Sequence, residues 1–128
     1  MDEIDATVLW VSGYYDGPLD GMCLVNEQMH WFSVDPETQD DWNEEEQEYN
    51  PRKYLVYELT DEEVRALTTQ HLRFELYVGN YRTCNHIVDP PRNLQPRDYW
   101  HKYYDNTEHI DPTEGKTPIG VMNDQANQ

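Results

Sequence analysis

The chain has 128 residues, enough for one domain that buries well over half of the surface exposed by the unfolded chain. Its formal net charge of −17 argues against nucleic acid and anionic membrane surfaces as direct partners, because both would be repelled. No apolar stretch approaches the roughly 20 residues that cross a bilayer. The mean hydropathy of −1.00 is low, but the aliphatic and aromatic residues are concentrated in runs, which predicts a compact domain with long polar loops.

The charge is distributed unevenly along the chain. Residues 1–51 contain 14 acidic residues and no lysine or arginine, so this part has a charge of −14. Residues 52–128 contain 12 acidic and 9 basic residues, which leaves −3. The first part would therefore attract a basic partner.

The termini and cysteines bear on the compartment. The segment Met1–Asp5 is acidic where a signal peptide would be basic, so we expect a cytoplasmic protein. Cys23 and Cys84 are far apart, and we expect two free thiols in a reducing compartment rather than a disulfide.

Three strands are predicted first, over Thr7–Tyr15, Met22–Val25 and Met29–Val34. The breaks between them are Asp16–Gly21, where two glycines supply positive φ and Pro18 presets its own φ, and the shorter Asn26–Gln28. This pattern predicts a three-stranded antiparallel meander.

An acidic segment follows, from Asp35 to Pro51. Eight of the 14 residues from Asp35 to Glu48 are acidic, and prolines near both ends discourage regular structure. We expect a loop with one helical turn. The simplest interpretation is a solvated linker, but Trp42 at its centre has little use in solubility and favours a binding role.

A fourth strand is predicted over Arg52–Leu59 and a helix over Asp61–Val78, begun by a capping box of Thr60 and Glu63. One face of this helix carries the apolar residues together with a histidine: Val64, Leu67, His71, Phe74 and Val78. A competing interpretation ends the helix near Gln70 and makes Leu72–Val78 a strand. A lone histidine on such a face is more often a satisfied core residue than a ligand.

Chemically capable side chains crowd together only at Cys84, His86 and Asp89. They could serve as nucleophile, base and acid, or as three metal ligands. Their spacing fits no zinc motif, and triad members usually come from distant positions. A catalytic or metal role is therefore the alternative here, not the first hypothesis.

The last part of the chain begins with a cluster of rings, of which Tyr99, Trp100 and Tyr103 are expected to pack on the sheet. We expect residues 1–106 to form a single compact domain and residues 107–128 an extended, partly disordered tail. Within this tail, Ile119, Val121 and Met122 could add a terminal strand.

The fold class expected is α+β, with a curved antiparallel sheet of four to five strands, SH3-like or a partly open barrel as one option, and one amphipathic helix packed across it. The candidate core residues are the large apolar residues of the strands and of the helix: Val8, Leu9, Trp10, Val11, Leu24, Trp31, Phe32, Leu55, Val56, Val64, Leu67 and Phe74.

The first functional hypothesis is a non-enzymatic binding protein, without cofactor or metal, that docks on a basic surface of a partner such as a nuclease, a nucleic-acid-binding complex or a toxin. Small acidic chains of phage or bacterial origin act in this way as inhibitors, immunity-type proteins or nucleic-acid mimics, an analogy of composition only. The candidate partner-binding residues are the carboxylates and rings of the acidic segment and of the first turn: Asp35, Glu37, Asp40, Asp41, Trp42, Glu44, Glu45, Glu46, Glu48, Tyr49, Tyr14 and Tyr15.

Two alternatives belong to other classes. The second hypothesis is a small enzyme or metal-binding protein built on Cys84, His86 and Asp89 with some of the histidines His30, His71 and His101. The third is a structural subunit whose rings pack against further copies of the chain.

Overall fold

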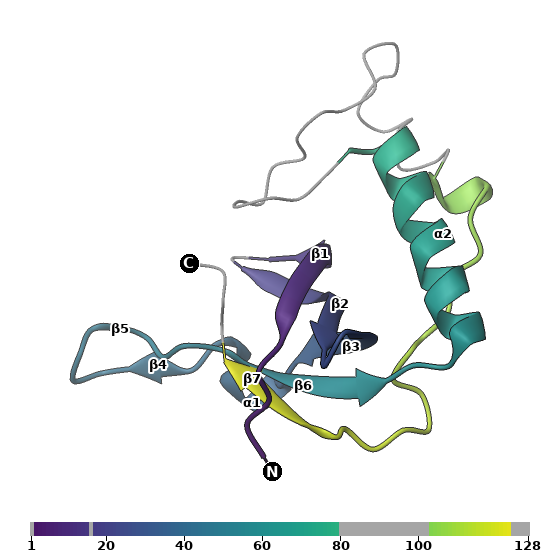
Figure 1. Ribbon diagram of the computed structural model, residues 1–128. Coiled ribbons are helices and arrows are strands. Elements are labelled where there is room, and N and C mark those ends of the chain that lie inside the picture. Colours follow the sequence, from purple (N-terminus) through teal and green to yellow (C-terminus); the bar gives the residue numbers. More distant parts are fainter. Residues whose placement is uncertain (1, 16, 80–102, 124–128) are drawn as a thin grey trace.

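The structure, a computed structural model, describes residues 2–15, 17–79 and 103–123 (Figure 1). It is an α+β fold, as expected, with one long helix and a five-stranded antiparallel sheet. The elements in chain order are β1 (Thr7–Tyr14), β2 (Pro18–Val25), β3 (Gln28–Val34), α1 (Pro36–Gln39), β4 (Trp42–Asn43), β5 (Glu48–Tyr49), β6 (Lys53–Glu58), α2 (Asp61–Tyr77) and β7 (Gly120–Asn123).

The meander of β1, β2 and β3 is confirmed, but the first turn is shorter than expected because β2 begins at Pro18. Gly17 has the positive φ of a turn, 136°. Gly21 instead lies inside the strand, opposite Val11, where a Cβ would come within 2.1 Å of the Trp10 carbonyl oxygen. Its role is close approach between strands, not positive φ.

The second turn is a tight two-residue connection. Val25 pairs with Gln28, and the two residues between them, Asn26 and Glu27, have φ of 50° and 67°. Positive φ at both central positions is the type I′ pattern, whose twist matches that of the flanking strands. This turn fixes the register of β2 against β3.

The sheet is strongly curled and open. Its strand order is β1-β2-β3-β6-β7, so β1 and β7 are the two edge strands. The segment before β1 nevertheless reaches β7 through one parallel bridge between Glu3 and Val121, where Ile4 N donates to Val121 O at 2.7 Å. Figure 1 shows this segment crossing β7.

Alternate residues of the strands face two separate cores. One core lies inside the curl of the sheet and contains Ala6, Cys23, Val25, Phe32, Tyr54, Val56 and Met122. The other lies between the sheet and α2 and contains Met22, Trp31, Tyr57 and Leu67.

The expectation that Leu9 is a core residue is wrong, since 39% of Leu9 is exposed. The register of β1 shifts between Val8 and Trp10, so Leu9 is the extra residue of a β-bulge. Because of the bulge, Val8 and Trp10 lie on opposite faces of the sheet: Val8 packs on the core inside the curl and Trp10 on the core under α2.

Helix α2 has the expected capping box. Thr60 N donates to Glu63 Oε1 at 2.9 Å, and Glu63 N donates to Thr60 Oγ1 at 3.2 Å. The helix ends at Tyr77, Val78 is its C-cap, and Gly79 follows with a positive φ of 123°. The alternative of a strand over Leu72–Val78 is therefore wrong. No helix in the described residues is long and apolar enough to cross a membrane.

The terminal strand expected around Val121 and Met122 is confirmed as β7, which pairs with β6 and buries Met122. The segment that leads to it is held against the start of α2 by Lys116. Lys116 Nζ donates to Glu58 O at 2.8 Å and forms an ion pair with Glu63 Oε1 at 2.7 Å.

Candidate functional site

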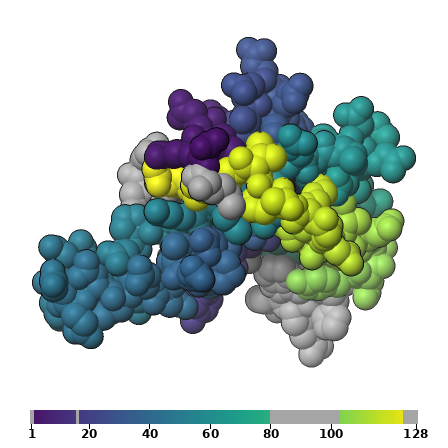
Figure 2. All heavy atoms as spheres, turned by 90° about the horizontal axis from the view of Figure 1, so that it is seen from below, coloured from purple at the N-terminus to yellow at the C-terminus, as the bar shows by residue number. Residues whose placement is uncertain are grey.

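The acidic segment folds into a short helix, α1, and a two-stranded hairpin, β4–β5. The helical turn is as expected, but the remainder is a hairpin and not an irregular loop. Figures 1 and 2 show that this hairpin, residues 41–50, projects from the body of the molecule on the side away from α2. We call it the acidic hairpin.

The tip of the hairpin is closed by Asn43. Its Oδ1 accepts from the backbone N–H groups of Glu45 at 3.0 Å and Glu46 at 3.1 Å. Gln47 adopts a left-handed φ of 56° and its Nε2 donates to Glu44 O. Asparagine is favoured at such positions because its side chain bonds to the backbone two residues on.

The base of the hairpin is held by Asn50. Asn50 N donates to Asp41 O at 2.8 Å, and Asn50 Nδ2 donates to Asp41 Oδ2 at 3.0 Å. Asn43 Nδ2 in turn donates to Asn50 Oδ1 at 3.2 Å. An isolated hairpin of this length is marginal in water, so these side-chain bonds are needed to keep it folded.

Two aromatic rings face each other across the hairpin. Trp42 and Tyr49 are directly paired, with ring centroids 5.0 Å apart and planes at 77°, the edge-to-face arrangement. They stay 43% and 62% exposed. We call Trp42 and Tyr49 the ring pair; it presents large apolar surface on a structured element.

Carboxylates surround the ring pair. Five of them are exposed and make no hydrogen bond or ion pair with any described residue: Asp40, Glu44, Glu45, Glu46 and Glu48. Asp41 instead helps to hold the hairpin base, and Asp35 caps α1 by accepting from Glu37 N at 3.1 Å. The segment 35–50 has no lysine or arginine.

Arg52 joins the hairpin to the sheet. This side chain is buried, and it donates to three carbonyl oxygens: Tyr15 at 2.8 Å, Pro18 at 3.2 Å and Gln39 at 3.2 Å. Nothing in the sequence marks Arg52, because its partners lie up to 37 positions away. It brings the first turn and the root of the hairpin together.

The remaining predicted binding residues lie at this root. Tyr15 is 62% exposed and its carbonyl oxygen is bound by Arg52. Tyr14 is the last residue of β1 and is only partly exposed. The structure thus gathers the two rings and most of the carboxylates of the acidic segment on one projection, leaves Asp35 and Glu37 at α1, and places Tyr15 near the root of the projection.

The residues of the alternative enzyme or metal site, Cys84, His86, Asp89 and His101, lie outside the described residues, as do Tyr99 and Trp100. Within the described ranges, no three His, Cys, Asp or Glu side chains form a group that could hold a metal ion. Cys23 is buried, and burial raises the pKa of its thiol to about 12.

The two described histidines of that hypothesis have structural partners. His71 stacks on Trp10 with centroids 4.4 Å apart and its Nε2 lies 2.6 Å from Glu75 Oε1, as expected of a satisfied core histidine. His30 is buried, with Nδ1 3.0 Å from Gln28 O.

The sequence gives no sign of one further titratable group, Asp20 on β2. The pKa of this carboxyl is raised to about 6: burial is the main cause, a hydrogen bond from the Gly13 backbone opposes the shift, and the nearby charge of Asp111 adds to it. Burial of the Tyr103 hydroxyl is the main cause of the raised pKa of Tyr103, and the Asp20 charge contributes to it. Tyr103 is buried, but its ring packs edge-to-face at 5.3 Å on Phe74 of α2, where the sequence led us to expect packing on the sheet.

Comparisons with protein-family models, with curated proteins and with solved structures found no match. The functional argument therefore depends on the geometry of the chain itself, in which the acidic hairpin combines exposed rings with carboxylates that no described residue neutralises.

Proposed function

We propose that this chain is a non-enzymatic binding protein whose acidic hairpin docks on a basic surface of a protein partner. The observation that carries the proposal is the ring pair, Trp42 and Tyr49, held half-exposed on a projecting hairpin among carboxylates that form no ion pair with a described residue. A linker that served only solubility would have no need for a paired, half-exposed tryptophan and tyrosine on a structured hairpin.

The ring pair supplies the affinity in this proposal. Tryptophan and tyrosine dominate binding hot spots because they bury large areas when they enter a pocket. The side chains of Asn43 and Asn50 hold the hairpin in shape, so less conformational entropy is lost on binding than for a free loop.

The carboxylates supply the rate and the selectivity. The part of the chain that contains the hairpin has a charge of −14, and its field would draw a basic surface toward the ring pair. The same field repels acidic competitors.

The partner classes that fit are those expected from the charge: a nuclease, another nucleic-acid-binding complex or a toxin. The chain would act on them as an inhibitor or immunity-type protein, with nucleic-acid mimicry if the carboxylates occupy the positions of phosphates. The cytoplasmic location stays a prediction.

The test compares four immobilised forms of the chain in a pull-down from the lysate of the source cell at low salt. The native chain is set beside a ring variant, Trp42→Ala with Tyr49→Ala, and a charge variant with Asp40→Asn, Glu44→Gln, Glu45→Gln, Glu46→Gln and Glu48→Gln. The five substituted carboxylates make no hydrogen bond or ion pair with a described residue, so we expect the hairpin to stay folded in the charge variant.

The fourth form controls for net charge. It removes five exposed carboxylates outside the hairpin by the substitutions Asp2→Asn, Asp5→Asn, Glu27→Gln, Glu62→Gln and Glu114→Gln. We expect a basic protein to be captured by the native chain and by this control, and to be lost by the ring and charge variants. With the purified partner, the charge variant should lower the association rate roughly tenfold, and the ring variant should mainly raise the dissociation rate. If no protein shows this pattern, the hairpin is only a solvated projection.

We also propose that the curl of the sheet corresponds to the SH3-like or partly open barrel expected as one option. The bridge between Glu3 and Val121, which brings the segment before β1 to the opposite edge strand, supports this comparison.

A further inference from the structure

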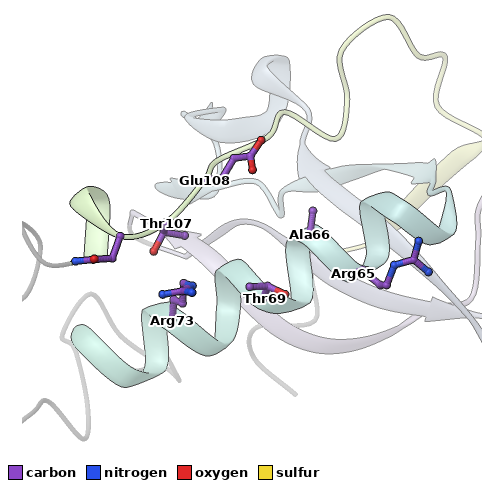
Figure 3. Close-up of a pocket in the computed structure, with 7 residues that line it drawn as sticks. Arg65, Ala66, Thr69, Arg73, Thr107 and Glu108 are labelled. Atoms are coloured by element: carbon purple, nitrogen blue, oxygen red, sulfur yellow. The ribbon is translucent and has the colours of Figure 1, made fainter.

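A groove lies on the opposite side of the molecule from the acidic hairpin, between α2 and the segment 106–108. Its volume is about 500 Å³. Figure 3 shows the side chains that line it, which on α2 are Arg65, Ala66, Thr69 and Arg73 and on the facing segment are Asn106, Thr107 and Glu108. Arg73 points toward Thr107, and Arg65 lies at the other end of the row (Figure 3).

The two arginines of the groove have no partner in the described part of the chain. The chain has 26 acidic side chains for 9 basic ones, so free guanidinium groups are unexpected. Asp61 and Glu62 lie one helical turn before Arg65 and Glu108 lines the groove, yet none of these carboxylates forms an ion pair with either arginine in the described part of the chain. Arg65 and Arg73 make no ion pair or hydrogen bond with a described residue.

The spacing of the arginines defines what could bind both. They are eight residues apart on one helix, which at a rise of 1.5 Å per residue separates their Cα atoms by about 12 Å. An extended peptide advances about 3.3 Å per residue, so two of its side chains four positions apart span about 13 Å. Each guanidinium can bind a carboxylate through two parallel hydrogen bonds.

Exposed leucines adjoin the arginines on the outer face of α2. Leu72 and Leu76 are 59% and 65% exposed. Leu76 lies four positions after Leu72 and three after Arg73, so it is a neighbour of both on the helix surface. This apolar surface favours a peptide with an apolar side chain over a small free anion, which would leave the leucines in water.

We propose that the outer face of α2, from Arg65 to Leu76, together with the groove is a second docking surface, and that its occupant is an acidic peptide segment of a partner protein. Two carboxylates of the segment, four positions apart, bind Arg65 and Arg73, and an apolar side chain next to the carboxylate at Arg73 covers the leucines, of which Leu72 lies level with Arg73 and Leu76 one turn beyond it. The Thr107 hydroxyl in the groove wall, which is buried without a hydrogen-bond partner, is available to a ligand if its side chain rotates. Nucleic acid is disfavoured, because the net charge of −17 opposes a dense polyanion far more strongly than a peptide with two carboxylates.

This inference does not depend on the function of the hairpin. The hairpin and α2 lie at opposite sides of the molecule in both views (Figures 1 and 2), so the two surfaces can be occupied together. The chain would then bridge a basic surface and an acidic segment.

The test titrates the ¹⁵N-labelled full chain with a synthetic nine-residue peptide that carries two glutamates four positions apart and one leucine next to each glutamate on its outer side, so that a leucine can reach Leu72 and Leu76 in either chain direction. The matched peptide has glutamine in place of both glutamates. We expect the first peptide to shift the amide signals of α2 and of residues 106–108. Arg65→Gln and Arg73→Gln should each weaken binding about fivefold, whereas Lys53→Gln, which removes one exposed cation elsewhere, should leave the affinity within about twofold.

Other outcomes overturn the proposal. Three results would show that the surface does not recognise carboxylates: equal affinity for the glutamine peptide, an equal loss of affinity in Lys53→Gln, or no shift of the α2 amide signals. Displacement of the peptide by inorganic phosphate at equal concentration would indicate a small-anion site. Self-association that is lost in Arg73→Gln would identify a second copy of the chain as the occupant.

Discussion

Asp20 is a carboxyl whose pKa the fold raises to about 6 from its ordinary 3.8, chiefly by burial. Between these two pH values the folded chain holds a proton on Asp20 that the unfolded chain has lost. The folded state therefore binds more protons there, and stability falls as the pH rises through this window. Above pH 6 the fold carries the full cost of a buried, ionised carboxylate.

Substitution of Asp20 by asparagine should remove this cost. We expect Asp20→Asn to unfold at the same denaturant concentration as the native chain near pH 4, and to be more stable at pH 7 by on the order of 1–3 kcal/mol. Asparagine keeps an oxygen that can accept the hydrogen bond from the Gly13 backbone. Urea unfolding at a series of pH values measures the difference.

The control is Asp5→Asn, which removes an equal charge from an exposed position. Its stability relative to the native chain should change little between pH 4 and pH 7. A loss of stability in Asp20→Asn at pH 7 would show that the ionised carboxylate is favoured by its surroundings, contrary to the argument.

At the scale of elements, the acidic hairpin depends on one side chain outside it. Arg52 joins three segments, because its guanidinium group donates to carbonyl oxygens of the first turn, of β2 and of α1. Gly17 makes room for it, since a Cβ there would lie 2.9 Å from Arg52 Nη1. The orientation of the hairpin relative to the sheet therefore follows from a buried arginine.

Replacement of Arg52 by methionine should fill the same space without donors. The carbonyl oxygens of Tyr15 and Gln39 would lose the hydrogen bond from the guanidinium group, and Pro18 O would keep only the one from the Tyr54 hydroxyl at 2.9 Å. We expect the free energy of unfolding to fall by about 3 kcal/mol. Arg52→Lys should recover only part of this, because an ammonium group cannot reach three separate acceptors with the planar geometry of guanidinium. Chemical denaturation measures both, and amide exchange in residues 41–50 reports whether the hairpin loosens.

The neighbouring substitution Lys53→Met removes the same charge from an exposed side chain and should cost little. Equal losses in Arg52→Met and Lys53→Met would mean that the effect comes from net charge and not from the three hydrogen bonds.

At the scale of the whole molecule, the net charge of −17 acts on stability and on binding in opposite directions. Like charges repel one another within the folded chain, and salt screens this repulsion. Salt also screens the attraction between the hairpin and a basic partner.

We therefore expect the melting temperature to rise by a few degrees between low and high sodium chloride concentrations, while the association rate with a basic partner falls. Differential scanning fluorimetry and stopped-flow measurements over the same salt series test the two signs together. The charge variant of the hairpin should show a weaker dependence in both. Binding that is unchanged by salt would exclude steering by the carboxylates.

Much of the fold is predictable because the signals are local. The turn at Asn26, the capping box of Thr60 and Glu63, and the apolar face of α2 each depend on residues within a few positions of one another. The helix and the first four strands of the main sheet follow from them, with errors of a few residues at their ends. The acidic composition around Trp42 is the source of the binding hypothesis, which needs no knowledge of the fold and stays a prediction.

The hairpin itself was harder to foresee. Its strands have only two residues each, too few to show alternation, and the prolines at the ends of the segment favour a loop. The chemistry that makes the hairpin is present in Asn43 and Asn50, but its effect depends on a cross-strand pairing that has no periodic signal.

The sequence alone determined the fold class, the order of the main elements and the acidic character of the first half, since propensity, turn chemistry and charge are properties of short segments. Tertiary structure alone decided the bulge at Leu9, the burial of Asp20, the three-way contact of Arg52 and the groove with two free arginines. Each of these depends on residues brought together from distant positions, such as Arg52 and Tyr15, which are 37 positions apart. Contacts of that kind form only after folding has brought distant segments together, so no local sequence pattern predicts them.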